Sequence, residues 1–214
     1  MRYVKMLALA AVAAGALMAF LGAGTASATV LCSTTADPCP TGQDVLAGTV
    51  VDLSSTGSTV LTDTSGETTL DTCTVSTLKG KTTNTGGTTE TVEIGVETLS
   101  WEKCTFPTKT LKTADLEVHK IATTSNGTVT AGGTFEVTIN TIFFGSCIYG
   151  VTKGTSIGDL TEGKPAIFHA TKAVAEKFSG SAAACPETSL WTSTYTVTEP
   201  KETTLSVSTF AQGQ

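Results

Sequence analysis

The sequence has little charge and, beyond its first residues, no arginine. Charged residues make up 15% of the 214-residue chain and aromatic residues 6%. Arg2 and Lys5 precede a long apolar run, so residues 29–214 carry 13 − 2 = 11 Lys against 19 Asp and Glu, a net charge of −8. Such a chain lacks the basic surface that nucleic acids and anionic membranes require. We therefore expect no nucleic-acid partner and no anionic lipid partner.

Proline is also scarce, whereas threonine and glycine are abundant. The chain has 6 Pro and 21 Gly, and about one residue in five is Thr. A threonine-rich glycosylated stalk would need many more prolines. Threonine is β-branched and favours strands, and glycine favours turns. Because apolar residues alternate with polar ones through these tracts, the composition predicts a β-rich globular fold.

The first 28 residues have the pattern of a signal peptide. Met1–Lys5 is basic, Met6–Gly24 is apolar, and Ala26-Ser27-Ala28 supplies the small residues that signal peptidase accepts. We expect cleavage before Thr29, export from the cell, and one all-β domain over residues 29–214. An uncleaved anchor is the alternative, since the apolar run approaches the ~20 residues that span a bilayer. Lipidation of Cys32 is not expected, because Leu31 precedes it.

Six cysteines fit an oxidising compartment. None lies in residues 1–28 and no two have the C-x-x-C spacing, so neither a zinc ribbon nor a thioredoxin-like site is expected. Six cysteines allow 15 pairings. We expect the sequential ones, which suit neighbouring hairpins: Cys32–Cys39, Cys73–Cys104 and Cys147–Cys185.

Strands are predicted from the alternation of apolar and polar residues. In Thr88–Trp101 the inward face changes parity, which predicts a β-bulge near Thr98. Asn126-Gly127 predicts a type I′ hairpin turn. Ile167–Phe178 can be a strand or a helix, and the β-rich context favours a strand. The other expected strands are Val45–Leu53, Val60–Thr64, Thr68–Leu78, Leu111–Ile121, Thr134–Phe144, Ile148–Val151, Leu190–Val197 and Thr204–Phe210.

These strands and disulfides predict an antiparallel β-sandwich, Ig-like or jelly-roll-like. A closed β-barrel with a ligand cavity is the alternative, because sequence periodicity does not separate the two. No linker divides residues 29–214.

Patterns that could carry catalysis are weak. Gly154-Thr155-Ser156-Ile157-Gly158 matches G-x-S-x-G, but Gly163 and Pro165 leave no room for the helix that the motif needs. Glycosidases need two facing carboxylates; the nearest are Glu93, Glu97 and Glu102, with Trp101 and Trp191 as possible sugar platforms. Glu93 and Glu97 alternate with core residues, as on any solvent-exposed face.

Patterns that could bind a metal or a glycan are equally weak. Glu117 and His119 share a strand face and with His169 would form a two-histidine, one-carboxylate set, although nothing in the sequence brings His169 close. The segment 63–67 offers oxygen ligands to calcium without the full loop spacing, and a tight turn is expected instead. Asn126-Gly127-Thr128 is a glycosylation sequon.

Several short segments resemble an uncharacterised family of secreted actinobacterial proteins. The segments are Asp71-Thr72-Cys73-Thr74, Thr77-Leu78-Lys79-Gly80, Gly145-Ser146-Cys147 and Trp191-Thr192-Ser193-Thr194-Tyr195-Thr196-Val197. The resemblance implies export, disulfides and an all-β fold, and it brings no activity or catalytic residue.

We therefore assign no catalytic, cofactor or metal-binding residue from the sequence. The leading hypothesis is an exported, non-catalytic binding or structural module of the cell envelope or the exterior, whose partner is unknown; an envelope glycan or protein would fit. One alternative is a small secreted carbohydrate-active hydrolase with a glutamate pair. Another is a barrel that binds an apolar ligand, which a lined internal cavity would favour.

Overall fold

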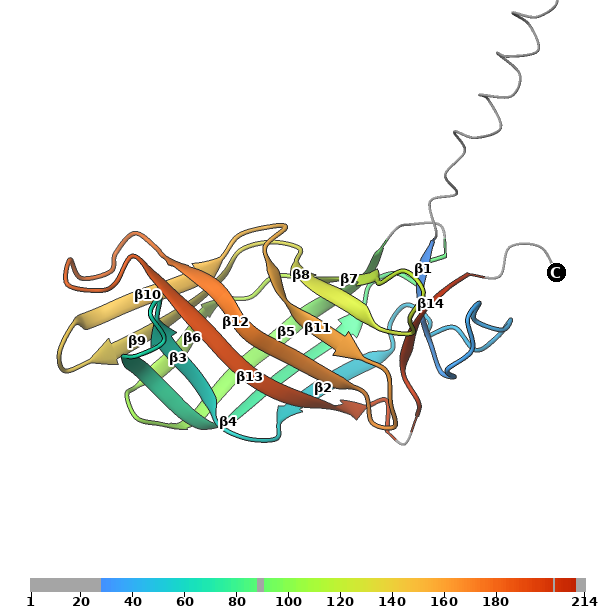
Figure 1. Cartoon of the computed structure of the whole chain (residues 1–214), viewed down its shortest axis with the longest axis horizontal. Helices are drawn as coiled ribbons and strands as arrows, with labels where there is room; N and C mark the ends of the chain where they lie inside the picture. The colour runs from blue at the N-terminus through green and yellow to red at the C-terminus, as the bar shows by residue number, and fades with distance from the viewer. Residues whose placement is uncertain (1–27, 88–90, 202, 211–214) are drawn as a thin grey trace, which may run out of the picture.

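The computed structural model describes residues 28–87, 91–201 and 203–210, and in this part of the chain the regular structure is β (Figure 1). No helix among these residues is long and apolar enough to cross a membrane. The expected signal peptide falls on residues 1–27, outside the described part, and on Ala28. The strands are β1 (Thr29–Cys32), β2 (Val50–Ser55), β3 (Thr59–Asp63), β4 (Thr69–Thr82), β5 (Thr91–Cys104), β6 (Thr108–Lys112), β7 (Leu116–Lys120), β8 (Gly127–Ala131), β9 (Phe135–Thr141), β10 (Gly145–Val151), β11 (Ser156–Thr161), β12 (Ile167–Lys177), β13 (Thr188–Glu199) and β14 (Ser206–Thr209).

Eight antiparallel strands close into a barrel in the order β2-β4-β5-β7-β8-β11-β12-β13 and back to β2. The closing ladder pairs Leu53 of β2 with Val197 of β13. The expected sandwich is therefore wrong, and the barrel alternative is correct. Alternation shows which face of a strand is buried, and that face is buried in both architectures; the pairing of two strands so far apart in sequence is what distinguishes them.

Four long strands carry the barrel beyond this ring. β4, β5, β12 and β13 have 14, 14, 11 and 12 residues. In one half of the molecule the wall between these long strands is completed by β2, β7, β8 and β11. In the other half it is completed by β3, β6, β9 and β10, so the molecule is elongated (Figure 1). We call the part with β2, β7, β8 and β11 the capped half, and the part with β3, β6, β9 and β10 the hollow half.

A separate ribbon of β1 and β14 caps one end of the barrel. Leu31 of β1 belongs to the main hydrophobic core. Leu205, which directly precedes β14, and Val207, which lies within β14, belong to it as well. Asp37 fastens the Cys32–Cys39 loop to this ribbon by accepting hydrogen bonds from the backbone N–H and hydroxyl of Thr209 at 3.0 and 2.8 Å. The ammonium of Lys120, on β7, lies 2.8 Å from the same carboxylate. The cap is thereby tied to the barrel wall.

The opposite end is filled by a second, smaller cluster of apolar side chains. Ile139, Tyr149 and the Cys147–Cys185 disulfide belong to it, and Phe106 and Phe144 pack against it. Burial, and to a lesser extent the charge of Glu187, raises the pKa of Tyr149 to about 12, and its hydroxyl donates to the carbonyl of Pro186 at 3.1 Å. The hollow half is thus closed at its far end by packed side chains.

Several sequence predictions are confirmed. The three disulfides pair the cysteines sequentially, as expected. The segment that could be strand or helix is β12. The register of β4 against β5 passes from Lys79 opposite Thr98 to Gly80 opposite Val96, which is the predicted bulge.

Other strand predictions are wrong in detail. Asn126-Gly127 is not a type I′ turn: Gly127 opens β8, and Thr123 has the positive φ in the preceding loop. The expected strand Leu111–Ile121 is divided between β6 and β7. Phe143, expected to face inward, is 76% exposed between β9 and β10. Strands β1, β8 and β11 were not predicted.

Candidate ligand cavity

The hollow half holds a cavity of about 110 Å³, lined by side chains of both apolar clusters. Its wall is almost wholly apolar and comes from strands on every side of the barrel. Typical lining residues are Leu61 of β3, Leu99 of β5, Val137 of β9 and Ala175 of β12. The lining also includes the disulfide-bonded Cys73 and the carboxylate-bearing Asp71.

The bulge in β5 supplies part of this lining. Before it, Val92, Ile94 and Val96 face the core of the capped half. Since side chains alternate along a strand, an unbroken β5 would turn Leu99 and Trp101 outward. The extra residue resets the parity, so that Leu99 and Trp101 point into the hollow half.

Four aromatic side chains form one side of the cavity. The Trp101 and Trp191 rings are 6.4 Å apart in an edge-on arrangement, and Trp191 meets Tyr195 at 6.1 Å. Phe168 stacks on Tyr195 at 5.9 Å. Such pairs are stabilised beyond the burial of their area. These contacts link β5, β12 and β13 through their aromatic side chains.

The polar groups near the cavity are already paired. The Tyr195 hydroxyl and the Ser76 hydroxyl are 2.8 Å apart, and Thr59 and Ser193 are linked in the same way at 2.8 Å. Burial raises the pKa of Tyr195, so its hydroxyl stays neutral. Among the buried side-chain nitrogen and oxygen atoms of the described residues, Trp191 Nε1 has no hydrogen-bond partner. The cavity thus offers very little to a polar ligand.

Asp71, a carboxylate in the lining, has a structural role. It accepts hydrogen bonds from the backbone N–H groups of Thr72 at 2.8 Å and Phe106 at 3.1 Å, and from the hydroxyl of Thr108. These bonds hold the turn that leads from β5 into β6. Because its oxygens are engaged this way, Asp71 anchors the wall without offering a free charge to the cavity.

The wall is weakest between β5 and β6. In the described part of the chain β6 forms a backbone ladder with β9 only, so no ladder joins it to β5. Here the Thr110 hydroxyl links the two strands: it accepts from Trp101 Nε1 at 2.9 Å and donates to the carbonyl of Leu99 at 2.6 Å. We call this contact the β5–β6 seam. It lies beside the cavity, because Trp101 and Leu99 both line it.

The residues considered for catalysis are not assembled into a site. Ser156 is exposed at the start of β11, so a strand follows it where a nucleophile elbow needs a helix. Glu93 and Glu97 alternate with buried residues, and Glu97 pairs with Lys81 at 2.8 Å. Glu102 is exposed, whereas Trp101 beside it points into the barrel. These carboxylates do not face one another across the cavity.

The suggested metal ligands are not brought together either. Glu117 Oε2 lies 3.9 Å from His119 Nε2, and its other oxygen pairs with Lys153 at 3.4 Å. His169 lies on β12, beyond β8 and β11, and its Nδ1 contacts the Thr194 hydroxyl at 3.4 Å. Within the described residues, the one compact group of potential ligands is Asp71 with Cys73 and Cys104. Its two sulfurs are joined in a disulfide, which removes them as thiolate ligands.

The remaining polar patterns are turns. The Asp63 carboxylate accepts from the Ser65 hydroxyl at 2.7 Å and the Thr68 N–H at 3.3 Å, and these bonds lower its pKa to about 2. Segment 63–67 is therefore the expected tight turn, closed by its own aspartate. Asn126 accepts from the Glu162 N–H at 2.9 Å, which joins two loops; glycosylation at this residue stays a prediction.

The chain was compared with protein-family models, curated proteins and solved structures, and none matches. The expected family resemblance therefore stays a prediction, apart from its coarser content: the protein is all-β and disulfide-bonded. Trp101 and Trp191, considered from the sequence as possible sugar platforms beside a glutamate pair, line the apolar cavity together with Tyr195. The parity change at Thr98 was the available signal that aromatic side chains gather in the second half of the barrel.

Proposed function

We propose that the protein is an exported carrier of a small apolar molecule, held in the cavity of the hollow half. The observation that carries the proposal is a space of about 110 Å³ whose polar neighbours are almost all internally paired. It corresponds to the barrel alternative raised from the sequence. The three disulfides, which are typical of extracellular proteins, support export.

The size of the cavity limits the ligand. Apolar cavities of about 150 Å³ remain dry and take up benzene or xenon. At about 110 Å³, this cavity suits a molecule close to benzene in size, or a short apolar chain. Leaving it empty costs about 24 cal/mol per Å³, or about 2.6 kcal/mol, which a bound apolar molecule would offset.

The β5–β6 seam is the proposed access route. One end of the barrel is covered by the β1–β14 ribbon and the other by the cluster around Cys147 and Cys185. Every other junction of the hollow half has a backbone ladder. Among the described residues, the hydrogen bonds that join β5 directly to β6 are the two of Thr110. Their loss would weaken this junction while Asp71 still holds the turn between the two strands, so the junction can open without unfolding the barrel.

Thermal unfolding and tryptophan fluorescence with benzene as the probe test the proposal. Benzene should raise the unfolding midpoint in a saturable way and alter the emission of Trp101 and Trp191. Ala175→Leu fills the cavity and should abolish both effects. Val174→Leu, the neighbouring position on β12 that faces outward, should leave them unchanged.

The proposal is wrong if benzene leaves wild type unchanged, or if Ala175→Leu responds to benzene as wild type does. A glycan that shifts the midpoint of both variants equally would favour a surface-binding module instead.

A further inference from the structure

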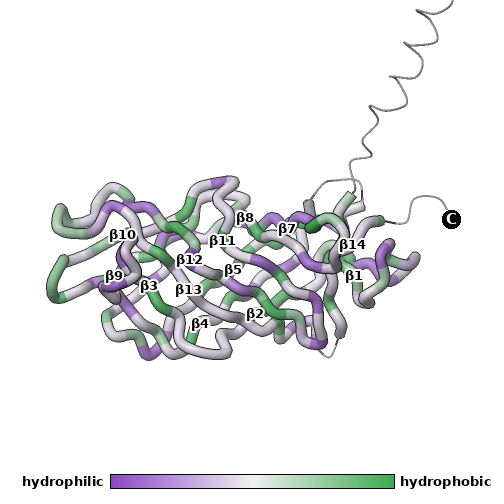
Figure 2. Tube along the Cα trace, in the orientation of Figure 1, coloured by the Kyte–Doolittle hydropathy of each residue, from purple (hydrophilic) through white to green (hydrophobic). Residues whose placement is uncertain are grey.

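The far end of the hollow half carries an apolar tip without charge. It consists of the β9–β10 connection with the strand ends beside it, residues 140–147, and of residues 178–186, which are the β12–β13 connection without its last residue, Glu187. Neither segment contains Asp, Glu, Lys, Arg or His. Ile142 is 80% exposed and Phe143 is 76% exposed, the two largest values among the exposed large hydrophobic residues of the described chain. Figure 2 shows both loops at the extremity of the molecule.

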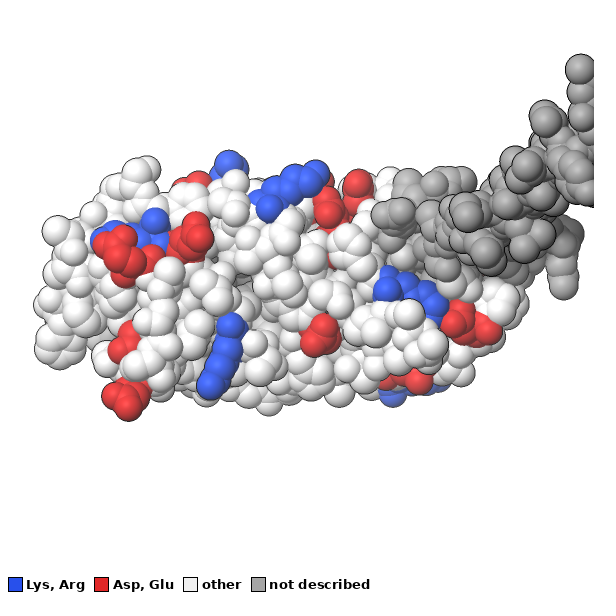
Figure 3. Space-filling model, turned by 45° about the horizontal axis from the view of Figure 1, so that its top comes forward, with Lys and Arg blue, Asp and Glu red and all other residues white. Residues whose placement is uncertain are grey.

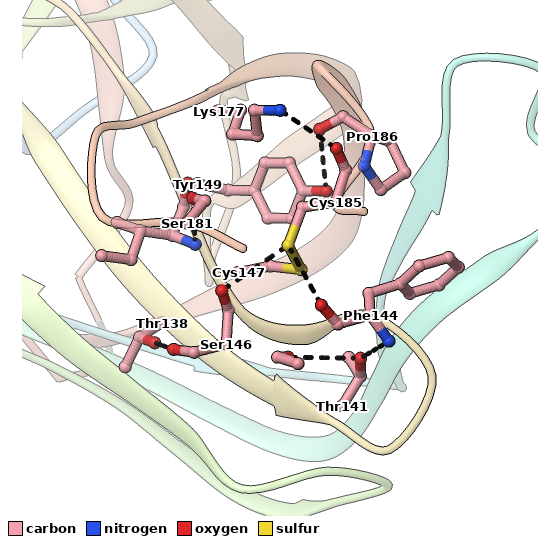
Figure 4. The surroundings of a disulfide bond; sticks show 12 residues. Thr138, Thr141, Phe144, Ser146, Cys147, Tyr149, Lys177, Ser181, Cys185 and Pro186 are labelled. Carbon is pink, nitrogen blue, oxygen red and sulfur yellow. Dashed lines mark hydrogen bonds between the residues drawn. A yellow bond between two sulfur atoms is a disulfide. The ribbon is translucent and has the colours of Figure 1, made fainter. Parts of the chain in front are cut away.

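The two loops of this tip are locked together (Figure 4). The Cys147–Cys185 disulfide joins them covalently. Backbone bonds run from the Ala182 N–H to the Ser146 carbonyl at 2.8 Å and from the Phe178 N–H to the Ile148 carbonyl at 2.9 Å. Ile142 and Phe143 are thus presented on a braced support, and holding them exposed costs little further conformational entropy on docking.

Charge begins only at the edge of the tip. Lys177 is the last residue of β12 and Glu187 is the last residue of the β12–β13 connection, and the two form an ion pair with each other. On the face shown in Figure 3 the extreme end of the molecule carries no charged side chain, and charged side chains begin a short way behind it. The acidic β3–β4 turn with Asp63 and Glu67 also lies at this end, but β3 and β4 are opposite β9 and β10 in the strand order. The apolar tip therefore occupies one side of the rim.

We propose that this tip docks the protein on an electrically neutral lipid surface, with Ile142 and Phe143 inserted among the acyl chains. A charge-free, aromatic-bearing loop pair is the chemistry that a bilayer interface accepts. A second copy of the chain fits less well, since two side chains cannot supply the roughly 800 Å² per partner of a stable interface. Anionic lipid fits less well too, because the residues from 29 onward carry a net charge of −8 (11 Lys against 19 Asp and Glu). This inference stands apart from the cavity, although docking would bring the cavity's end of the barrel to a source of apolar molecules.

Sedimentation with vesicles of pure phosphatidylcholine tests the inference. The oxidised protein should bind these vesicles, and its partitioning should not weaken in raised salt, because no charge pair is involved. Ile142→Ser/Phe143→Ser should lower partitioning by at least roughly tenfold. The control Leu46→Ser/Leu111→Ser changes two leucines outside the tip that are 60% and 48% exposed, and this variant should bind as wild type does.

Phe143→Trp gives an independent readout of insertion. Its added emission should shift to the blue with vesicles and be quenched by lipid brominated on the acyl chains. Four results would overturn the inference: no binding by wild type, equal binding by the tip variant, binding only to vesicles with anionic lipid, or a dimer that the tip variant dissociates. Benzene binding without vesicles should be unchanged in Ile142→Ser/Phe143→Ser, so the carrier proposal and the docking proposal can fail separately.

Discussion

Replacing Thr110 by valine should accelerate ligand exchange without changing affinity. The substitution keeps the shape of the side chain and removes the hydroxyl that accepts from Trp101 Nε1 and donates to the Leu99 carbonyl. Each hydrogen bond contributes about 0.5–1.5 kcal/mol net, so the closed seam loses about 1–3 kcal/mol relative to the open one. Because 1.4 kcal/mol is a factor of ten, the open population should rise roughly 5- to 150-fold.

Stopped-flow fluorescence with benzene measures both rate constants through the two cavity tryptophans. If the ligand passes through the seam, association and dissociation should both accelerate by the same factor, since the bound and free proteins are both closed. The dissociation constant should therefore change by less than about twofold. Thr77→Val is the matched control: its hydroxyl pairs with that of Ser100 at 2.6 Å across β4 and β5, which a backbone ladder already joins.

Two outcomes would refute this reasoning. Unchanged rates in Thr110→Val would mean that the ligand enters elsewhere, for example through the cluster at Cys147 and Cys185. An increase in dissociation alone would mean that the substitution damages the cavity. Equal acceleration in Thr77→Val would show a general loosening of the barrel, with no special role for the seam.

Three further predictions concern stability and the cavity wall. Burial alone would raise the pKa of Asp37, but bonds from Lys120, Thr209 and Ser208 outweigh it and hold the pKa far below the usual range. Asp37→Asn should thus destabilise the protein by about 1–2 kcal/mol near neutral pH, because Lys120 is 7% exposed but solvent screens the Asp37 carboxylate, which is 33% exposed. The deficit in urea unfolding should shrink as the pH falls below about 4, because the depressed pKa stabilises the fold only where unfolded aspartate is ionised. Tyr195→Phe should cost about 1–2 kcal/mol by leaving the buried Ser76 hydroxyl without its partner, and Tyr195→Phe/Ser76→Ala should cost less than the sum of the two single changes. Deleting Thr98 should remove the bulge yet leave Trp101 inward with its emission unshifted, because Val96 and Leu99 then alternate regularly opposite Gly80 and Leu78; a red-shifted spectrum would show that the inward parity of Trp101 does not rest on one extra residue.

The sequence predicts faces and local links better than it predicts closure. The parity of β13, with Trp191, Tyr195 and Val197 inward, can be read directly, because burial imposes a period of two. Sequential disulfides follow from the hairpin order. The contact between β2 and β13 joins strands that are far apart in sequence. Both strands would show the same alternation of apolar and polar residues if they lay at the edges of a sandwich. Alternation therefore could not choose the barrel.

Glycine misled the analysis at β8 for a packing reason. Gly127 was assigned to a turn, yet it is a buried strand residue. A Cβ there would lie 2.8 Å from a Val207 methyl and 2.9 Å from the His119 carbonyl, so glycine is present because the β14 ribbon packs directly on the strand. A glycine required by close approach looks the same in the sequence as one required by positive φ.

The hollow itself follows from which side chains point inward in each half. An eight-stranded ring is just wide enough for side chains to fill, or to hold one small ligand when some of them are small. In the capped half Ile94, Leu116 and Leu160 leave a space of about 20 Å³. In the hollow half Thr59, Thr108 and Ala175 occupy inward positions, and a wall without a ladder at β5–β6 is not drawn together by backbone hydrogen bonds. Small inward residues, beside a seam that lacks a backbone ladder, therefore leave a cavity in this half of the barrel. A larger side chain at any of these positions would fill the cavity.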